Sequence, residues 1–366
     1  MNADDAYAVL TEQLGYGRSE RLLSILESLI TPDQARMSVA LPGTVPEVAE
    51  QTGFDEAEIK ESLDALFSKG VVFVRGDFIT REYYRFARSV GQLHDATLAT
   101  KQVDIVKDQV FLDQWQDFCL NEWYPDMGAS QTSQASPALR IVPVYKAFEN
   151  TDDVLPCEDF RELMRAQELI AVVPCACRVR TAGVDEPCQH CDEGERWNCL
   201  QFGRAADYVI KRGSGKALSI EEALELVDDM EEDALLHIWV NSDRMTGMHF
   251  NCNCCRDCCA NYVSMDILDE PIGKAWEKSR FEAIIDQDKC DGCQDCVDRC
   301  QFDAIDLVKP DKAAKGKASR KSKKMKAIVD PKKCWGCGVC VPGCKEANAI
   351  GFKAVRPAEH IPAAVI

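Results

Sequence analysis

Two cysteine runs near the end of the printed sequence decide the fold of that region. They are Cys290-Asp-Gly-Cys293-Gln-Asp-Cys296-Val-Asp-Arg-Cys300 and Cys334-Trp-Gly-Cys337-Gly-Val-Cys340-Val-Pro-Gly-Cys344. Both have the spacing C-x2-C-x2-C-x3-C, in which the first three cysteines can surround three corners of a cubic iron–sulfur cluster. The fourth cysteine of each run is expected on the helix that follows, pointing at the other cluster.

The runs belong to an internal repeat of 44 residues. Residues 283–286, Ala-Ile-Ile-Asp, correspond to residues 327–330, Ala-Ile-Val-Asp. Each half is therefore predicted to contain a strand, a cysteine loop, a short helix and a second strand. Gly292 and Gly336 lie within the loops, where a residue without a side chain would let the backbone approach the sulfides of a cluster.

The arrangement resembles the bacterial-type two-[4Fe–4S] ferredoxins. That resemblance implies two ligand sets, which are Cys290, Cys293, Cys296 and Cys344 for one cluster and Cys334, Cys337, Cys340 and Cys300 for the other. A four-cysteine zinc site is the alternative, but zinc sites do not normally interleave eight cysteines. Gln301 and Lys345 depart from the family, in which a proline follows the fourth cysteine, so the local packing and the reduction potential need not follow it.

A second cysteine-rich region precedes this module. Its ten cysteines are Cys175, Cys177, Cys188, Cys191, Cys199, Cys252, Cys254, Cys255, Cys258 and Cys259. The pieces P-C-x-C-R, C-L-x-F-G and C-N-C-C-x-x-C-C resemble a segment that precedes two-cluster ferredoxin domains in iron–sulfur proteins of anaerobes. The region is expected to hold one or two further iron–sulfur clusters or a zinc ion between residues 175 and 259.

The ligands within this region are less defined. We expect one cluster on Cys177, Cys191, Cys199 and either Cys252 or Cys254. Adjacent cysteines point in different directions, so the Cys-Cys pairs are expected to serve two sites or to lie outside the ligand shell. Arg178 and Arg256 could offset the negative charge of a cluster. His190, His237 and His249 are possible ligands, although solvated or core positions are commoner for histidine.

Residues 1–100 are predicted to form a helical domain that resembles a winged helix. Residues 45–52 and 55–69 read as helices, the second with Asp55 as its N-cap, and residues 71–80 read as a hairpin turning at Gly76-Asp77. The second helix carries five acidic residues and two lysines, a balance that phosphates would repel. DNA binding is therefore disfavoured, and protein docking or dimerisation is expected.

Residues 101–170 form a mixed helical and linker region. We expect a helix over 111–123, a loop over 127–137 and a helix over 156–170. Cys119 and Cys157 each stand in an apolar segment, and both are expected in the core. Further on, Ser219 with Glu222 predicts a helix that begins with a capping box.

The overall composition limits the remaining possibilities. The chain has 366 residues, 46% of them hydrophobic, 20 cysteines and a formal net charge of −18. No span of about 20 apolar residues and no secretory leader is visible, so we expect a cytoplasmic protein without membrane insertion. The acidity disfavours nucleic acid or anionic membranes as partners. Residues 309–326, however, carry nine Lys or Arg, either as a solvated loop or as a docking site for an acidic redox partner.

These observations predict an α+β multidomain protein. It would contain a winged-helix-like domain (1–100), the linker region (101–170), a cysteine-rich α/β domain (171–275) and a ferredoxin-like dicluster domain (276–366). The expected function is that of a multi-cluster electron-transfer subunit of a complex or homo-oligomer, passing single electrons to or from an oxidoreductase partner. The alternatives are a redox-sensing transcriptional regulator and an enzyme with an unusual catalytic cluster in 175–259. No phosphate loop, dinucleotide motif or nucleophile elbow is found.

Overall fold

The computed structural model describes residues 3–148, 151–182, 184, 197–309 and 325–364. The chain divides into two compact units, each assembled from separate stretches of sequence. The first unit comprises residues 1–130, 169–217 and 258–269, and the second comprises residues 131–168, 218–257 and 270–366. The expected cysteine-rich stretch 171–275 is thus shared between the two units.

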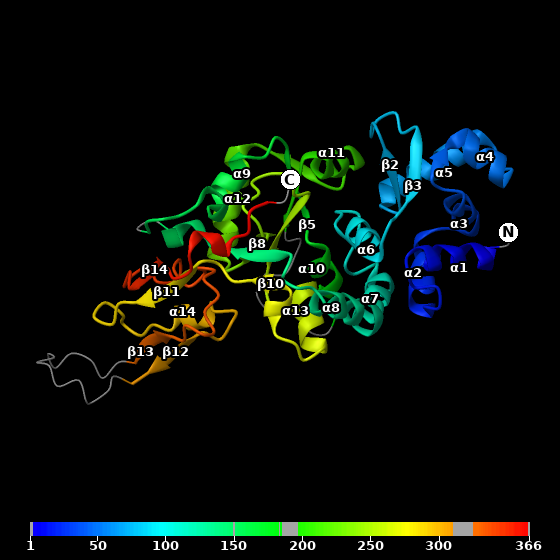
Figure 1. Ribbon diagram of the computed structural model, residues 1–366. Coiled ribbons are helices and arrows are strands. Elements are labelled where there is room, and N and C mark those ends of the chain that lie inside the picture. Colours follow the sequence, from blue (N-terminus) through cyan, green and yellow to red (C-terminus); the bar gives the residue numbers. More distant parts are fainter. Residues whose placement is uncertain (1–2, 149–150, 183, 185–196, 310–324, 365–366) are drawn as a thin grey trace, which may run out of the picture. The chain divides into compact units, whose positions relative to one another are not determined.

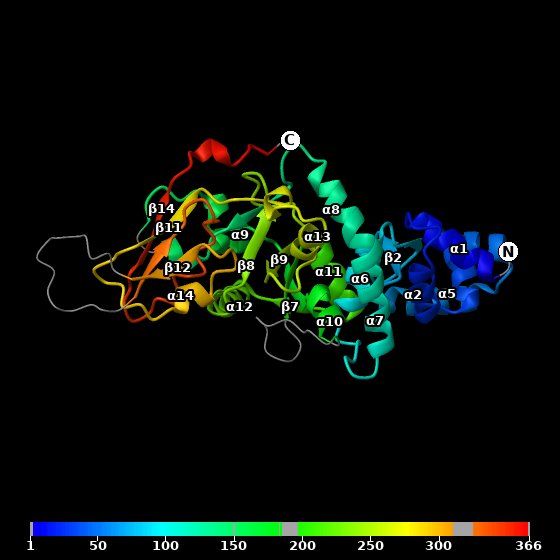
Figure 2. The same ribbon diagram turned by 90° about the horizontal axis from the view of Figure 1, so that it is seen from below.

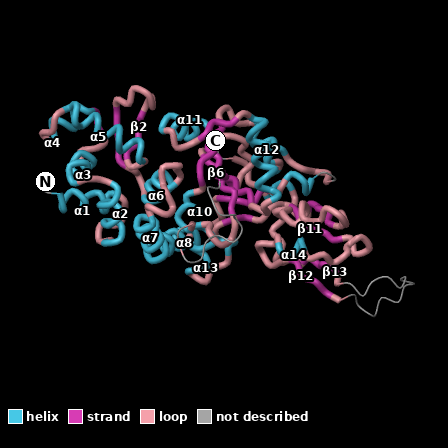
Figure 3. The backbone as a smooth tube through the Cα atoms, turned by 180° about the vertical axis from the view of Figure 1, so that it is seen from behind, coloured by secondary structure: helices cyan, strands magenta, loops and turns pink. Residues whose placement is uncertain are grey.

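The first unit is mainly helical up to residue 130, as Figure 3 shows in cyan. The helices are α1 (Ala3–Gln13), α2 (Glu20–Leu29), α3 (Pro32–Val39), α4 (Val45–Thr52), α5 (Glu56–Lys69), α6 (Val90–Leu98), α7 (Gln109–Phe118), the π-helical turn η1 (Cys119–Trp123) and α8 (Tyr124–Thr132). Their apolar faces form one core, which includes Leu22, Ile25, Leu63, Trp115 and Phe118.

The predicted helix pair of the N-terminal region is present as α4 and α5. The Asp55 side chain accepts the Ala57 backbone N–H at 2.9 Å, and Gly70 ends α5 in the left-handed conformation. Strands β1 (Gly43–Thr44), β2 (Val72–Arg75) and β3 (Tyr83–Phe86) form an antiparallel sheet in the order β1-β3-β2. A winged helix stays an interpretation of this arrangement.

The hairpin differs from the prediction in its length. The strand that pairs with β2 is β3, so the connection spans residues 76–82 rather than a tight turn within 71–80. The Asp77 carboxylate accepts the N–H groups of Ile79 and Thr80 at 2.7 and 2.8 Å. These two bonds hold the chain in a local turn after Gly76, so the second strand of the hairpin begins later in the sequence than predicted.

Two other predicted elements are wrong in part. The first part of the loop expected at 127–137 belongs to α8, which continues to Thr132. Gly128 of this helix packs closely on Leu268, since an added Cβ would lie 2.6 Å from that side chain. The helix expected over 156–170 is only the 3-10 turn η3 (Pro156–Glu158) and α9 (Phe160–Arg165), and Ile170 already begins a strand.

The rest of the first unit contains β5 (Ile170–Pro174), α10 (Ala176–Thr181), β6 (Trp197–Phe202), α11 (Gly203–Arg212) and α13 (Ala260–Ile267), with β7 (Lys216–Leu218) at its boundary. β5 and β6 are antiparallel. Tyr208 of α11 stacks on Phe73 of β2 at 5.2 Å, and Arg204 donates to the Val74 and Gly76 carbonyls. The hairpin is therefore packed against α11.

The second unit contains a sheet in which β10 (Trp276–Glu277), β4 (Leu139–Val142), β8 (Leu236–Val240) and β9 (Phe250–Cys254) are successive neighbours. α12 (Ile220–Glu232) begins with the predicted Ser219–Glu222 capping box. Short 3-10 turns complete the unit, namely η2 (Tyr145–Phe148), η3, η4 (Ile272–Lys274) and η5 (Ala358–His360). His237 is a fully buried core residue, stacked on Phe160 at 4.1 Å.

The cysteine runs lie in the C-terminal part of this unit. Its elements are β11 (Phe281–Ile285), α14 (Asp295–Asp298), β12 (Ile305–Val308), β13 (Lys326–Val329) and β14 (Ile350–Ala354). The first strand of each half pairs antiparallel with the last strand of the other half, β11 with β14 (Figure 2) and β13 with β12 (Figure 1). The predicted short helix is missing from the second half, where Pro342 and Gly343 favour turns instead.

Candidate metal centres

Two cavities lie within the C-terminal part of the second unit, and both are surrounded by cysteines. The first is lined by Cys290, Cys293, Cys296 and Cys344. The second is lined by Cys300, Cys334, Cys337 and Cys340. Each cavity therefore takes three cysteines from one run and the last cysteine from the other run, which is the grouping that the sequence predicts.

Backbone amides point at the sulfurs of these cavities. Ala327 N–H donates to Cys290 Sγ at 3.4 Å, Ala304 N–H to Cys300 Sγ at 3.3 Å, and Ala349 N–H to Cys344 Sγ at 3.2 Å. Such bonds favour the thiolate form and raise the potential of a bound cluster. The two halves of the repeat thus present the same kind of donor to equivalent sulfurs.

Burial makes these cysteines poor free thiolates. Burial, followed by the charges of Cys293 and Cys344, raises the pKa of Cys296 to about 12. Burial likewise raises the pKa of Cys337 and Cys340. A cationic metal core overcomes this penalty because it deprotonates the thiols that coordinate it. The cavities, their four sulfurs and their amide donors therefore fit a [4Fe–4S] cluster each.

The two cavities differ in their surroundings, and we call the first the outer site and the second the inner site. Cys293 at the outer site is exposed, whereas Cys334, Cys337 and Cys340 at the inner site are buried. The Asp295 amide favours the Cys293 thiolate, but burial and the carboxylates of Asp295 and Asp291 outweigh it and raise its pKa. At the inner site, the Val144 amide donates to the Cys337 carbonyl at 2.9 Å.

The loop glycines also lie against the backbone of other segments. Gly292 and Gly336 have φ values of +75° and +67°. An added Cβ would lie 2.1 Å from the Met325 carbonyl oxygen at Gly292, and 2.2 Å from the Phe281 carbonyl oxygen at Gly336. Among described atoms, the glycines thus make room for the backbone of a neighbouring strand segment, and this contact sets the position of each loop.

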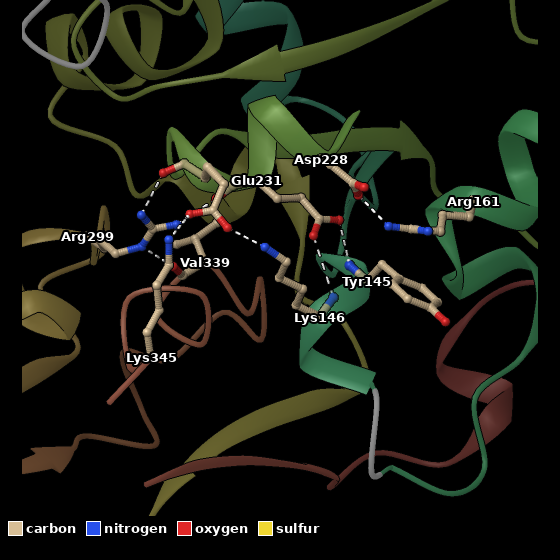
Figure 4. Close-up of polar contacts among 9 residues, drawn as sticks. Tyr145, Lys146, Arg161, Asp228, Glu231, Arg299, Val339 and Lys345 are labelled. Atoms are coloured by element: carbon tan, nitrogen blue, oxygen red, sulfur yellow. Dashed lines mark hydrogen bonds and ion pairs between the residues drawn. The ribbon is translucent and has the colours of Figure 1, made fainter. Parts of the chain in front are cut away.

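Arg299, between the last two cysteines of the first run, connects three parts of the second unit (Figure 4). Its guanidinium donates to the carbonyls of Val339 at 2.6 Å, Glu231 at 2.6 Å and Glu232 at 2.7 Å. The two glutamates end α12, and Val339 lies in the second cysteine run. Sequence reasoning missed this residue, because its partners are 40 to 68 positions away.

The two residues that replace the family's prolines contact the same end of α12. Gln301 is buried and donates to the Ala234 carbonyl at 2.5 Å. Lys345 pairs with the Glu232 carboxylate at 2.6 Å, and Lys146 pairs with that carboxylate as well. These hydrogen bonds lower the pKa of Glu232 to about 2. The departures from the ferredoxin pattern therefore serve to join the module to α12.

The upstream cysteines are distributed over both units. Cys175, Cys177, Cys199, Cys258 and Cys259 belong to the first unit, while Cys252, Cys254 and Cys255 belong to the second. Cys188, Cys191 and His190 lie outside the described residues. Within the single turn 255–258, ligand atoms of Cys255, Asp257 and Cys258 lie within 4.8 Å of one another.

The arginines near these cysteines differ in how deeply they are buried. Arg178 is buried, but Arg256 is half exposed and pairs with Asp303 at 2.9 Å. Arg180, which was not singled out, is 1% exposed. His237 Nδ1 donates a hydrogen bond to Asn253 Oδ1 at 2.7 Å, and His249 is exposed. Cys119 and Cys157 are buried, as predicted.

Comparison with known proteins bears on the C-terminal module. Residues 289–348 match the family model of the 4Fe–4S dicluster domain. The dicluster domain covers both cysteine runs, so the match implies [4Fe–4S] binding by this segment. No curated protein and no solved structure matches the chain. In the described residues, every helix is too short or too polar to cross a membrane.

Proposed function

We propose that this chain is a multi-cluster electron-transfer protein that passes single electrons to or from an oxidoreductase partner. The observation that carries the proposal is the pair of separate cavities in the dicluster domain, each lined by four cysteines. When bound, each [4Fe–4S] cluster supplies one-electron redox chemistry, and the chain sets its potential and its exposure. Residues 175–259 would add at least one further cluster to this relay.

The difference between the two sites suggests a direction for the relay. The exposed Cys293 makes the outer site the point of exchange with a protein partner, while three of the four inner-site cysteines are buried. The inner site is fixed to that body through Val144, Arg280 and Arg299; Arg280 binds Glu158 at 2.9 Å. The basic segment 309–326 is proposed to steer an acidic partner, although residues 310–324 lie outside the described part.

The N-terminal region is proposed to bind protein rather than DNA. Glu56, Glu58 and Glu61 on α5 are exposed, and Lys60 on the same helix is paired with Asp64 at 2.6 Å. The hairpin that would contact a DNA backbone is held instead by Arg204. An acidic helix next to a hairpin that is already bound by Arg204 disfavours DNA binding. It favours a role in forming a cytoplasmic complex or a homo-oligomer.

Anaerobic electron transfer to a one-electron acceptor tests the proposed function. The dithionite-reduced protein is mixed with oxidised cytochrome c in a stopped-flow instrument, and the wild-type chain should reduce it. Cys296→Ser at the outer site should slow the reaction more than Cys340→Ser at the inner site. Clusters that cannot be reoxidised by any one-electron acceptor would contradict electron transfer, and equal slowing by both variants would contradict the outer site as the point of exchange.

A further inference from the structure

Two lysine side chains each bind the backbone of a cysteine that lines one of the two cavities. The Lys278 ammonium donates to the Cys334 carbonyl at 3.0 Å and to the carbonyl two residues earlier at 2.7 Å. The Lys326 ammonium donates to the Cys290 carbonyl and, at 2.9 Å, to the carbonyl three residues earlier. Cys334 and Cys290 are the first cysteines of the two runs. Each cluster site therefore has an ammonium group on the carbonyl of its first ligand.

The two lysines come from opposite halves of the repeat. Lys278 precedes β11 of the first half but binds the second run, and Lys326 begins β13 of the second half but binds the first run. In the first half, the residue that corresponds to Lys326 is Glu282, which pairs with Arg356 at 3.6 Å. Lys278, four residues before Glu282, supplies the ammonium at the inner site. The two sites thus share a positive charge that the sequence repeat does not show.

Neither ammonium forms an ion pair with a carboxylate of the described residues. Both lysines are half-buried. The Lys278 ammonium also lies 5.3 Å from the centre of the Trp335 ring, and Trp335 lines the inner cavity. Because partial burial weakens screening by water and salt, each of these charges acts on the neighbouring cavity more strongly than an exposed charge would.

A positive charge beside a ligand favours the reduced state of a cluster. Reduction adds one negative charge to a centre that already carries four thiolates, and local charge is one of the factors that set its potential. An ammonium held at the carbonyl of a ligating cysteine stabilises that added charge by Coulomb attraction. The effect is confined to the site whose first cysteine the lysine binds, because the interaction weakens with distance.

We propose that Lys278 at the inner site and Lys326 at the outer site are positioning residues that act through the first cysteine of each run. Each ammonium offsets the negative charge of the cluster at its own site and raises the midpoint potential of that cluster. The inference deepens the proposed function and rests on it for the presence of a cluster in each cavity. It assigns to two lysines the control of the potentials at which the chain exchanges electrons.

An EPR-monitored redox titration of the full chain under argon tests the proposal. Lys278→Gln removes the charge but keeps an N–H donor, so it should lower the midpoint potential of the inner cluster and leave the outer one within error of the wild type. Lys326→Gln should lower the potential of the outer cluster alone. Lys278→Arg and Lys326→Arg keep the charge and should retain the wild-type values. Cys296→Ser and Cys340→Ser assign the signals to the two sites.

The matched controls are Lys289→Gln and Lys333→Gln. These two lysines occupy equivalent positions of the repeat, directly before the first cysteine of each run, and both are exposed. Lys289 also pairs with Asp286 at 3.9 Å. Each control should shift the potentials less than Lys278→Gln or Lys326→Gln does. Equal shifts in the controls, or wild-type potentials in Lys278→Gln and Lys326→Gln, would overturn the proposal.

The same variants decide the case in which a substitution removes a cluster. Loss of the inner cluster in Lys278→Gln that Lys278→Arg restores would support a need for the charge, whereas loss in both variants would overturn the proposal for that site. The titration uses no protein partner. A chain that shows the expected shifts but fails to reduce cytochrome c would therefore contradict the proposed function and leave the role of the lysines standing.

Discussion

Arg299 shows how one side chain can fix the position of the cysteine runs. Its guanidinium donates hydrogen bonds to three backbone carbonyl groups, which belong to α12 and to the second cysteine run. Its neighbour Gly343 leaves room for this side chain, since a Cβ there would lie 2.5 Å from Arg299 Cδ. A hydrogen bond to a charged group contributes about 1.5–3 kcal/mol to stability.

Arg299→Ala should therefore destabilise the second unit by about 3 kcal/mol, because partly buried carbonyls lose their donor. Thermal loss of the visible cluster absorbance under argon measures the effect. The matched control is Arg256→Ala, which removes an exposed ion pair with Asp303 and should cost about 0–1 kcal/mol. If the temperature at which the cluster absorbance is lost falls equally in the two variants, the Arg299 side chain does not hold the second cysteine run to α12.

The carboxylates around Cys293 give a prediction for the potential of the outer cluster. Asp291→Asn removes a negative charge that acts on Cys293, so the midpoint potential of the outer cluster should rise. The inner cluster serves as the internal control and should stay unchanged within error. An EPR-monitored redox titration separates the two, and a shift confined to the inner cluster would reverse our assignment of the sites.

Among the elements, the cysteine loops depend most on backbone conformation. Gly292→Ala or Gly336→Ala combines a positive φ, costing about 1–2 kcal/mol, with a Cβ about 2 Å from a carbonyl oxygen. Either variant should bind fewer irons per chain. Gly273→Ala is the control, because its Cβ would meet only Trp335 at an ordinary 3.7 Å. Full iron content in the two loop variants would contradict the steric argument.

α6 is linked to the π-helical turn η1 through a buried histidine. Burial would lower the pKa of His94, but the Asp95 carboxylate, 2.9 Å from Nδ1, and the neighbouring Cys119 raise it to about 9. The pKa in the folded state lies above the unfolded value of about 6.5. The stabilisation is therefore fully present below that value and is lost as the pH rises through about 9.

The thermal midpoint of the wild-type protein should fall between about pH 6.5 and pH 9.5. His94→Gln removes the titrating group and should make this part of the profile flatter. Differential scanning calorimetry under argon over that pH range provides the measurement. Parallel profiles for the two proteins would mean that His94 is neutral in the folded state.

Local spacing predicted the elements that depend on nearby residues. The capping box at Ser219 and the helix ended by Gly70 follow from signals within a few positions. The second short helix and the strand after Gly76 were mispredicted, because a proline and an aspartate turn override the pattern. The grouping of the eight cysteines around two cavities also matches the repeat, since each run carries its own spacing.

At the scale of the whole molecule, the sequence could not show how distant stretches combine. The two units each contain three separate segments, so the expected domain 171–275 combines stretches that belong to both of them. The contacts that join the segments, such as Arg299 with α12 and Arg280 with Glu158, link positions with no common motif.

The central claim is that the dicluster domain carries [4Fe–4S] clusters that transfer electrons. Anaerobic iron and sulfide quantitation, combined with EPR of the dithionite-reduced chain, tests it most directly. The account predicts at least about eight irons per chain, with signals of reduced [4Fe–4S] clusters that change separately in Cys296→Ser and Cys340→Ser. Fewer than about eight irons, together with stoichiometric zinc, would contradict it.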